Sequence, residues 1–406
     1  HNPDRDRLMV KSLLTDEAAW IIYPEGRMVK NKKIFDKGRY VISHAGQKET
    51  PHTGAAALAL RTEFYRRRIK QMHKTYPPEA ERLLGLFKID SPTQVLDLDT
   101  YIVPVNLTYY PLRARENLLN YLAEHFVDDM SDRMEEELMT EGTMLFSGVD
   151  VDIRFGKPLK VAPVMDHPTI IKDIGDQRPI EFDEVLPSTP MMRTAAKDLM
   201  NRYMHAIYHM TTINPEHLFA GILRHLKRKT FELDDLKQRV FLAAAYSPTD
   251  SDDIRFHHDL RHPPVNLLVS DQKRWMEHFI HLALEKKVVE KKGNRYVKNQ
   301  KKLTTLYDFH RVRVENPIKV MVNEIEPVTA LQRRFRQIAR LPAFWVKRRV
   351  VQHLLRLGVD TFDNDYKTYF IENESKPNSV GRPFFLKGRP GKAGILLIHG
   401  YMAAPK

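Results

Sequence analysis

The chain reads WIIYPEGR at residues 20–27. The apolar run over residues 18–23 predicts a short strand, and Pro24 ends it because proline has no backbone donor. Glu25, Gly26 and Arg27 follow. Glycine permits close backbone approach, and an arginine can hold a phosphate through two hydrogen bonds. The stretch predicts a strand that leads into an anion-binding turn; the alternative is a plain strand-to-turn junction.

Strands and helices alternate through the first 165 residues. Helical spacing of apolar residues and β-branched runs predict helices at 4–15, 52–70 and 112–145, and further strands at 101–109 and 149–155. Such alternation is typical of an α/β fold with a mostly parallel, layered sheet. Pro104 lies inside its strand, which predicts a sheet edge or a bulge.

The amino-acid composition excludes several kinds of functional site. The 406 residues include 65 Lys+Arg against 52 Asp+Glu and no cysteine, which excludes disulfides, Cys-ligated zinc and thiol catalysis. No apolar run approaches the roughly 18–20 residues of a membrane span. We therefore expect a cytoplasmic protein, bound peripherally to the inner face of a membrane.

The positive charge is spread over several clusters. They suit a polyanionic partner such as an anionic membrane surface or an acidic carrier protein, and nucleic acid is the least expected partner because no zinc-finger or ribonucleoprotein motif is present. Taken singly, each cluster is better interpreted as a solvated helix face. The clusters lie at 66–68, 227–229, 291–292, 333–336 and 347–349.

Residues 166–372 are predicted to be mainly helical. Four helices, at 194–210, 216–228, 232–246 and 273–285, precede a small hairpin at 288–297, and one long basic helical stretch covers 320–357. The order of helices and hairpin resembles a winged-helix module, but a helical linker is the preferred interpretation. A connection rich in proline and glycine covers 373–392.

Four landmarks in order resemble the glycerolipid acyltransferase family over roughly residues 1–165. They are the WIIYPEGR block, a helix that opens at Gly54, the Val-Pro-Val strand around Pro104, and VDVDIRFGKPL at 149–159. The resemblance implies transfer of a fatty acyl group from acyl-CoA or acyl carrier protein to glycerol 3-phosphate or 1-acylglycerol 3-phosphate, without a further cofactor or metal. The family's threonine between glycine and arginine is absent, so Arg27 takes its place or marks a deletion.

The resemblance also assigns roles to residues of this sequence. It implies that the acceptor phosphate is bound by Glu25, Gly26 and Arg27. By the same resemblance, the site is shaped by Pro24, Val103 and Pro104. Anionic lipid or the donor would be attracted by Lys30, Lys32 and Lys33.

The family's catalytic pair is a histidine, the general base, and an aspartate that follows it after four intervening residues. His1 and Asp6 match this spacing, but about one such match is expected by chance, and it stands too close to Glu25. We interpret it as a decoy and expect the catalytic pair upstream of residue 1.

The end of the sequence, GILLIHGY at 394–401, resembles the oxyanion-hole strand of α/β-hydrolases, with His399 and Gly400 after the strand. The nucleophile motif Gly-x-Ser-x-Gly does not occur. We therefore predict a fragment of a bifunctional protein. Its parts are an acyltransferase domain (1–165), a helical region (166–372), the connection (373–392) and the first strand of a hydrolase (393–406).

Two other functions stay open. One is an α/β-hydrolase whose N-terminal region binds acyl groups without catalysis. The other is a basic adaptor that binds membranes or nucleic acid through residues 190–350.

Overall fold

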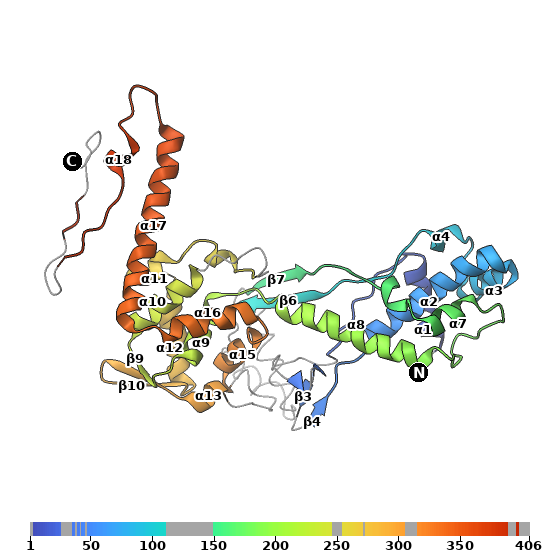
Figure 1. Ribbon diagram of the computed structural model, residues 1–406. Helices are drawn as coiled ribbons and strands as arrows, with labels where there is room; N and C mark the ends of the chain where they lie inside the picture. Colours follow the sequence, from blue (N-terminus) through green and yellow to red (C-terminus); the bar gives the residue numbers. More distant parts are fainter. Residues whose placement is uncertain are drawn as a thin grey trace, which may run out of the picture.

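The computed structural model describes residues 3–25, 35–36, 39–40, 42–44, 47–110, 149–245, 254–270, 273–304, 315–388 and 395–397. Helices dominate this part of the chain, and its sheets have two or three strands each. The buried apolar residues form two separate cores, one spanning Val10–Tyr208 and the other Ile213–Val350. Figure 1 shows the corresponding first region (3–210) and second region (211–350) at opposite sides of the molecule.

Helix α2 (Gly54–Thr75) is the centre of the first region. Its apolar residues recur at helical spacing, and Leu60, Phe64 and Ile69 are buried. The helices that pack around it are α1 (Pro3–Leu14), α3 (Pro77–Phe87), α4 (Thr93–Leu96), η1 (Ala162–Met165), α7 (Pro168–Gly175) and α8 (Thr189–His209). Two small hairpins precede α2, formed by β1 (Phe35–Asp36) with β2 (Arg39–Tyr40) and by β3 (Ile42–His44) with β4 (Gln47–Glu49).

An antiparallel ribbon lies between the two regions, beside the end of α8 (Figure 1). Strand β6 (Val105–Tyr110) pairs with β7 (Asp150–Phe155), and β5 (Tyr101–Ile102) pairs with β8 (Leu159–Lys160). The two pairs form one ribbon, because β5 leads into β6 and β7 leads into β8.

The second region is a helical core with one three-stranded sheet. Its sheet has the order β10-β11-β9 and is antiparallel throughout. Phe219 stacks on Phe279 in the core, with ring centroids 5.2 Å apart. The elements are α9 (Pro215–His225), β9 (Thr230–Phe231), α10 (Leu233–Ala244), η2 (His258–Leu260), α11 (Val265–Val269), α12 (Trp275–Glu285), β10 (Val289–Lys292), β11 (Arg295–Lys298), α13 (Gln300–Thr304), α15 (Pro317–Glu324) and α16 (Thr329–Arg340).

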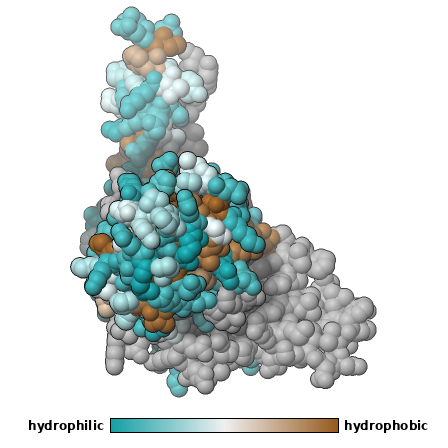
Figure 2. All heavy atoms as spheres, turned by 90° about the vertical axis from the view of Figure 1, so that its right-hand side faces the viewer, coloured by the Kyte–Doolittle hydropathy of each residue, from teal (hydrophilic) through white to brown (hydrophobic). Residues whose placement is uncertain are grey.

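Helix α17 (Ala343–Tyr369) leaves the second region and rises above the body of the molecule in Figures 1 and 2. Only Val346 and Val350 of its 27 residues are buried. After the helix the chain turns back along it through α18 (Asn378–Gly381). Asp363 accepts hydrogen bonds from the Asn378 amide (3.2 Å) and the Arg382 guanidinium (2.8 Å), which fasten the returning segment to the helix.

Most of the predicted elements are present. Six predicted helices are confirmed as α1, α2, α8, α9, α10 and α12, and the predicted hairpin is β10 with β11. The predicted helices at 112–145 lie outside the described residues.

Four expectations need correction. All named strand pairs of the described chain are antiparallel, so the mostly parallel sheet is wrong for this part. Residues 18–23 belong to no strand, since none of the described segments pairs with them, and Ile21 is 85 % exposed. Likewise residues 395–397 are exposed and outside any strand. The stretch 320–357 forms three helices rather than one, because Pro327 and Pro342 interrupt it.

The predicted boundary at residue 165 falls inside the first core. Ile170, Ile174, Leu199 and Tyr203 belong to the same buried cluster as Leu60. Helices α7 and α8 therefore complete the first region, and the change to the second core comes near residue 210.

Candidate functional site

The predicted phosphate block meets helix α2 at its start. The carbonyl oxygen of Pro24 accepts a hydrogen bond from the backbone N–H of His52, with 2.8 Å between nitrogen and oxygen. The carbonyl of His52 in turn accepts from the hydroxyl of Tyr203 on α8 at 3.1 Å. Glu25 is half-buried next to this contact. The segment 18–25 therefore ends beside the first turn of α2.

The N-terminus of α2 is open. Thr53 makes no side-chain cap, and the first turn has no acidic residue. The bond from the N–H of Ala57 to the carbonyl of Thr53 begins the helical ladder, so three earlier N–H groups have no partner within the helix. A Cβ added to Gly54 would meet nothing within 4 Å. An uncapped helix N-terminus with free space above it is suited to an anion.

The other residues assigned to the phosphate site follow directly in the chain. Gly26, Arg27, Lys30, Lys32 and Lys33 lie outside the described residues, as do His399 and Gly400. His1 is outside them as well, whereas Asp6 lies on α1 and accepts a hydrogen bond from Arg5 at 3.2 Å.

Pro104 divides the antiparallel ribbon, as its position in the sequence predicts. The pairs Ile102↔Leu159 and Val105↔Phe155 enclose two residues on one strand and three on the other, which is a β-bulge. At the bulge, the N–H of Gly156 donates to the carbonyl of Pro104 at 2.8 Å. The third and fourth sequence landmarks therefore lie side by side.

The ribbon turns a polar face toward the protein. The Asn106 amide donates to the carbonyl of Ile207 (2.9 Å), and the Arg154 guanidinium donates to the carbonyl of Met210 (2.9 Å). These bonds satisfy carbonyl groups at the C-terminal end of α8.

The opposite face of the ribbon is apolar and exposed. Phe155 is 73 % exposed and Ile153 is 55 % exposed, and the face also contains Tyr101, Val103, Leu107 and Val151. An exposed apolar face of this kind commonly receives an apolar ligand or partner.

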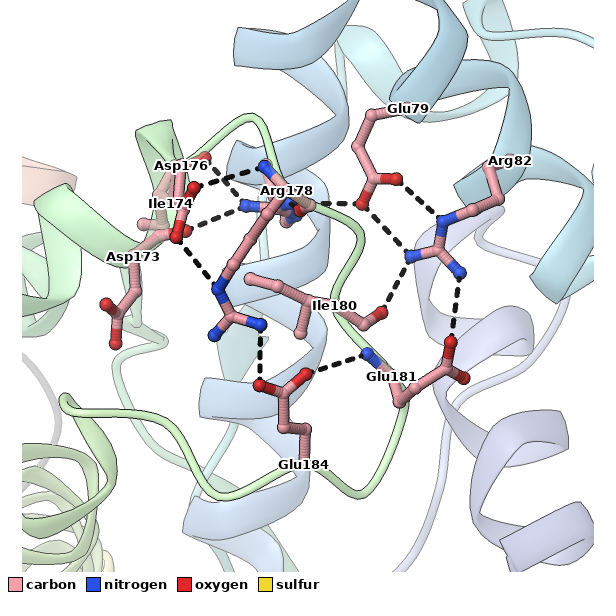
Figure 3. A network of polar contacts seen from close by, with 10 residues as sticks. Glu79, Arg82, Asp173, Ile174, Asp176, Arg178, Ile180, Glu181 and Glu184 are labelled. Atoms are coloured by element: carbon pink, nitrogen blue, oxygen red, sulfur yellow. Dashed lines mark hydrogen bonds and ion pairs between the residues drawn. The ribbon is translucent and has the colours of Figure 1, made fainter.

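The first basic cluster has an architectural role. Arg68 is fully buried and donates to the carbonyls of Asp173 (2.8 Å) and Arg178 (2.6 Å) and to the carboxylate of Glu79 (3.0 Å). Figure 3 shows this network, in which Arg82 also binds Glu79. The interpretation of 66–68 as a solvated face is wrong, because two of its three arginines hold the first region together.

Arg66 has the same function at another helix end. It is 1 % exposed and donates to the carbonyls of Leu13 (2.7 Å) and Leu14 (3.0 Å), the last residues of α1. Its Nε also reaches Thr100 Oγ1 at 3.3 Å, next to β5. The arginine thus joins α1, α2 and the start of the ribbon.

A histidine cluster that sequence reasoning missed lies where β7 meets the second region. Among the described residues, Asp150, His257 and His258 are grouped closely enough to be considered as metal ligands. His257 is buried, and its Nδ1 accepts from the N–H of Asp259 at 3.3 Å. A neutral ring then carries its proton on Nε2, which lies 3.3 Å from the Asp150 carboxylate but makes no hydrogen bond to it. We therefore interpret the cluster as a histidine–carboxylate contact.

Burial lowers the pKa of His257, helped by the neighbouring His258, while the aspartates oppose the shift. The sequence gives no sign of this cluster, because Asp150 and His257 are more than a hundred residues apart.

No family model, curated protein or solved structure matches the chain. Within the part of the chain that the structure describes, none of the helices combines the length and hydropathy that crossing a bilayer requires.

Proposed function

We propose that the chain is part of an acyltransferase that moves a fatty acyl group from a thioester to glycerol 3-phosphate or 1-acylglycerol 3-phosphate. One observation supports this most strongly. The hydrogen bond between His52 and Pro24 joins the first two landmarks of the family resemblance at an uncapped helix end that suits a phosphate.

In the proposed reaction, the acceptor phosphate lies at the start of α2, where Arg27 adds a charged pair of donors. A base removes the proton of the acceptor hydroxyl, and the resulting alkoxide attacks the thioester carbonyl. The tetrahedral intermediate collapses, and the thiol of CoA or acyl carrier protein leaves with the proton returned by the base. By the resemblance, this base is a histidine upstream of residue 1. The exposed apolar face of the ribbon would contact the acyl chain.

The proposal also covers the domains outside the phosphate site. We include in the proposal a winged-helix-like module over 215–298, because a helix, a strand, further helices and a hairpin follow in that order and the sheet order is β10-β11-β9. The acyltransferase domain and the α/β-hydrolase domain belong to the same proposal.

Titration of glycerol 3-phosphate into the protein tests the phosphate site directly. Gly54→Ala and Gly54→Asp are a matched pair, since a Cβ at this position meets nothing within 4 Å. An acid in the first turn stabilises a helix but repels a phosphate. We expect Gly54→Asp to raise the melting temperature and to weaken binding about tenfold or more, whereas Gly54→Ala leaves binding unchanged.

Arg27 provides the second half of the test. Arg27→Ala should weaken binding of glycerol 3-phosphate by about 1.5–3 kcal/mol, and Arg27→Lys should restore only part of it because an ammonium lacks the guanidinium fork. If both Gly54 variants bind as the parent does and Arg27→Ala changes only the melting temperature, the glycerophosphate site is refuted.

A further inference from the structure

A long segment of the second region has cations but no acids. Residues 327–359, which cover α16 and the first half of α17, contain eight Lys and Arg and no Asp or Glu. At the chain's average of 52 acids in 406 residues, about four would be expected. The charged side chains of this segment are therefore all positive.

Seven of these cations are exposed, and six of them lie on α16 and the first turns of α17 together with two exposed aromatic side chains. Phe344 is 66 % and Trp345 is 41 % exposed at the start of α17. We call this set the cationic corner; its members are Arg333, Arg336, Arg340, Phe344, Trp345, Lys347, Arg348 and Arg349. Among the ion pairs of the described residues, none involves a member of the corner.

The corner is held rigidly from below. Arg239 of α10 donates to the carbonyls of Ile338 (2.6 Å) and Leu341 (2.9 Å), which fixes the end of α16. Val346 is fully buried and anchors the first turn of α17. The exposed side chains therefore extend from a fixed backbone, so that little backbone entropy is lost when a partner binds.

The aromatic pair distinguishes among anionic partners. The rings of Phe344 and Trp345 lie 5.4 Å apart, and the guanidinium of Arg348 lies 5.2 Å from the centre of the Trp345 ring. A single-stranded nucleic acid stacks its bases on open ring faces, whereas the Trp345 ring is already in contact with Phe344 and Arg348. Exposed Trp and Phe among Lys and Arg are typical of a helix that lies at a membrane interface.

We propose that the cationic corner binds the surface of a bilayer that contains anionic glycerophospholipids. Phe344 and Trp345 enter the headgroup layer, and the surrounding arginines and lysine contact lipid phosphates. The inference rests on the proposed function in one respect, since the acceptor of that reaction would be supplied by a glycerolipid membrane.

Sedimentation with vesicles of phosphatidylcholine and phosphatidylglycerol tests the assignment. The variant Arg333→Gln/Arg336→Gln/Arg340→Gln removes three cations of the corner. Lys229→Gln/Lys291→Gln/Lys292→Gln removes three exposed cations around the β9–β11 sheet and is its matched control. We expect the corner variant to weaken binding about a hundredfold and the control only a few-fold. An equal loss in both variants would mean that net charge alone drives binding, which overturns the proposal.

Fluorescence locates the aromatic contact. The chain has three tryptophans, so Trp20→Phe/Trp275→Phe leaves Trp345 as the reporter. Its emission should shift to shorter wavelength on vesicles and be quenched by brominated lipid; an unchanged spectrum contradicts insertion.

Two further measurements separate the alternatives. Tighter binding of single-stranded DNA than of vesicles, abolished in the corner variant, would assign the surface to nucleic acid instead. The corner variant should bind glycerol 3-phosphate as the parent does, so failure of the phosphate site and failure of the membrane surface are observed independently.

Discussion

Two buried cations at helix ends, one in each region, are neutralised differently. In the first region Arg68 contacts the buried carboxylate of Glu79. In the second region Lys298 is 4 % exposed and donates to the carbonyls of Leu223 (3.0 Å), Arg224 (3.3 Å) and Leu226 at the end of α9, and no carboxylate among the described residues pairs with it. A cation that contacts only carbonyls keeps its burial cost, so burial lowers the pKa of Lys298.

The largest expected effect tests the ion-pair side of this comparison. Arg68→Met leaves Glu79 with Arg82 alone and deprives the carbonyls of Asp173 and Arg178 of their donor. We expect the free energy of unfolding, measured in urea, to fall by about 3–5 kcal/mol. The neighbouring Arg67→Met removes a half-exposed arginine and should cost at most about 1 kcal/mol. Equal losses would show that burial of the arginine does not decide its contribution.

A buried and an exposed helical glycine should also differ in their tolerance of one methyl group, since Gly221 is buried in the second region and Gly85 is exposed on the first. A Cβ on Gly221 of α9 would meet the ring of Phe335 at 2.2 Å, whereas a Cβ on Gly85 of α3 would meet nothing within 4 Å. We expect Gly221→Ala to lower the free energy of unfolding by about 3 kcal/mol and Gly85→Ala to raise it by about 0.5–1 kcal/mol. Thermal and urea denaturation of both variants measure the difference, and a neutral Gly221→Ala would mean that α9 and α16 are loosely packed.

Replacing the second region's buried lysine should have a smaller effect. Lys298→Met keeps most of the apolar stem but leaves the carbonyls at the end of α9 without donors. The expected loss is about 1–3 kcal/mol in the free energy of unfolding. Lys301→Met, an exposed control, should change it by less than about 0.5 kcal/mol. A loss of the same size in both variants would contradict the capping role.

At alkaline pH, buried groups of the two regions should change the free energy of unfolding in opposite directions. Burial lowers the pKa of Lys298 to about 8, against about 10.4 in an unfolded chain. Between these values the unfolded chain binds a proton that the folded chain lacks, so this lysine makes the free energy of unfolding rise with pH. The rise should vanish in Lys298→Met.

Tyr65 of the first core acts in the opposite direction. Burial raises its pKa to about 12, although nearby Arg61 opposes the shift. Above about pH 10 the unfolded chain loses a proton that the folded chain retains, so the free energy of unfolding falls. Tyr65→Phe should reduce this fall, to which Tyr203 also contributes because burial raises its pKa; a fall of unchanged size would show that Tyr65 does not cause it.

Local patterns in the sequence predicted the helices and the break at Pro104, because periodicity and proline act over a few residues. They did not reveal which cations are buried. Residues 66–68 and 347–349 are similar basic triplets, yet the first triplet contains the partners of Glu79 and Thr100 and the second is exposed. That difference depends on contacts between distant segments.

The candidate site was predictable only in part, for the same reason. The sequence identified Pro24 and Pro104, and the helix that opens at Gly54. It did not show that Pro24 bonds to His52 or that β6 pairs with β7, since both contacts join segments separated by tens of residues. Residues 18–23 looked like a strand because apolar composition does not specify a pairing partner.

Helix α17 has a consequence for amide hydrogen exchange. Its two buried residues, Val346 and Val350, lie in the first eight positions, and the later turns are held mainly by the returning segment through Asp363. Opening of the distal turns therefore exposes little apolar surface and needs little free energy. Deuterium should enter the amides near Tyr369 first and those near Val350 last, so that the helix opens progressively from its far end while the second core stays closed.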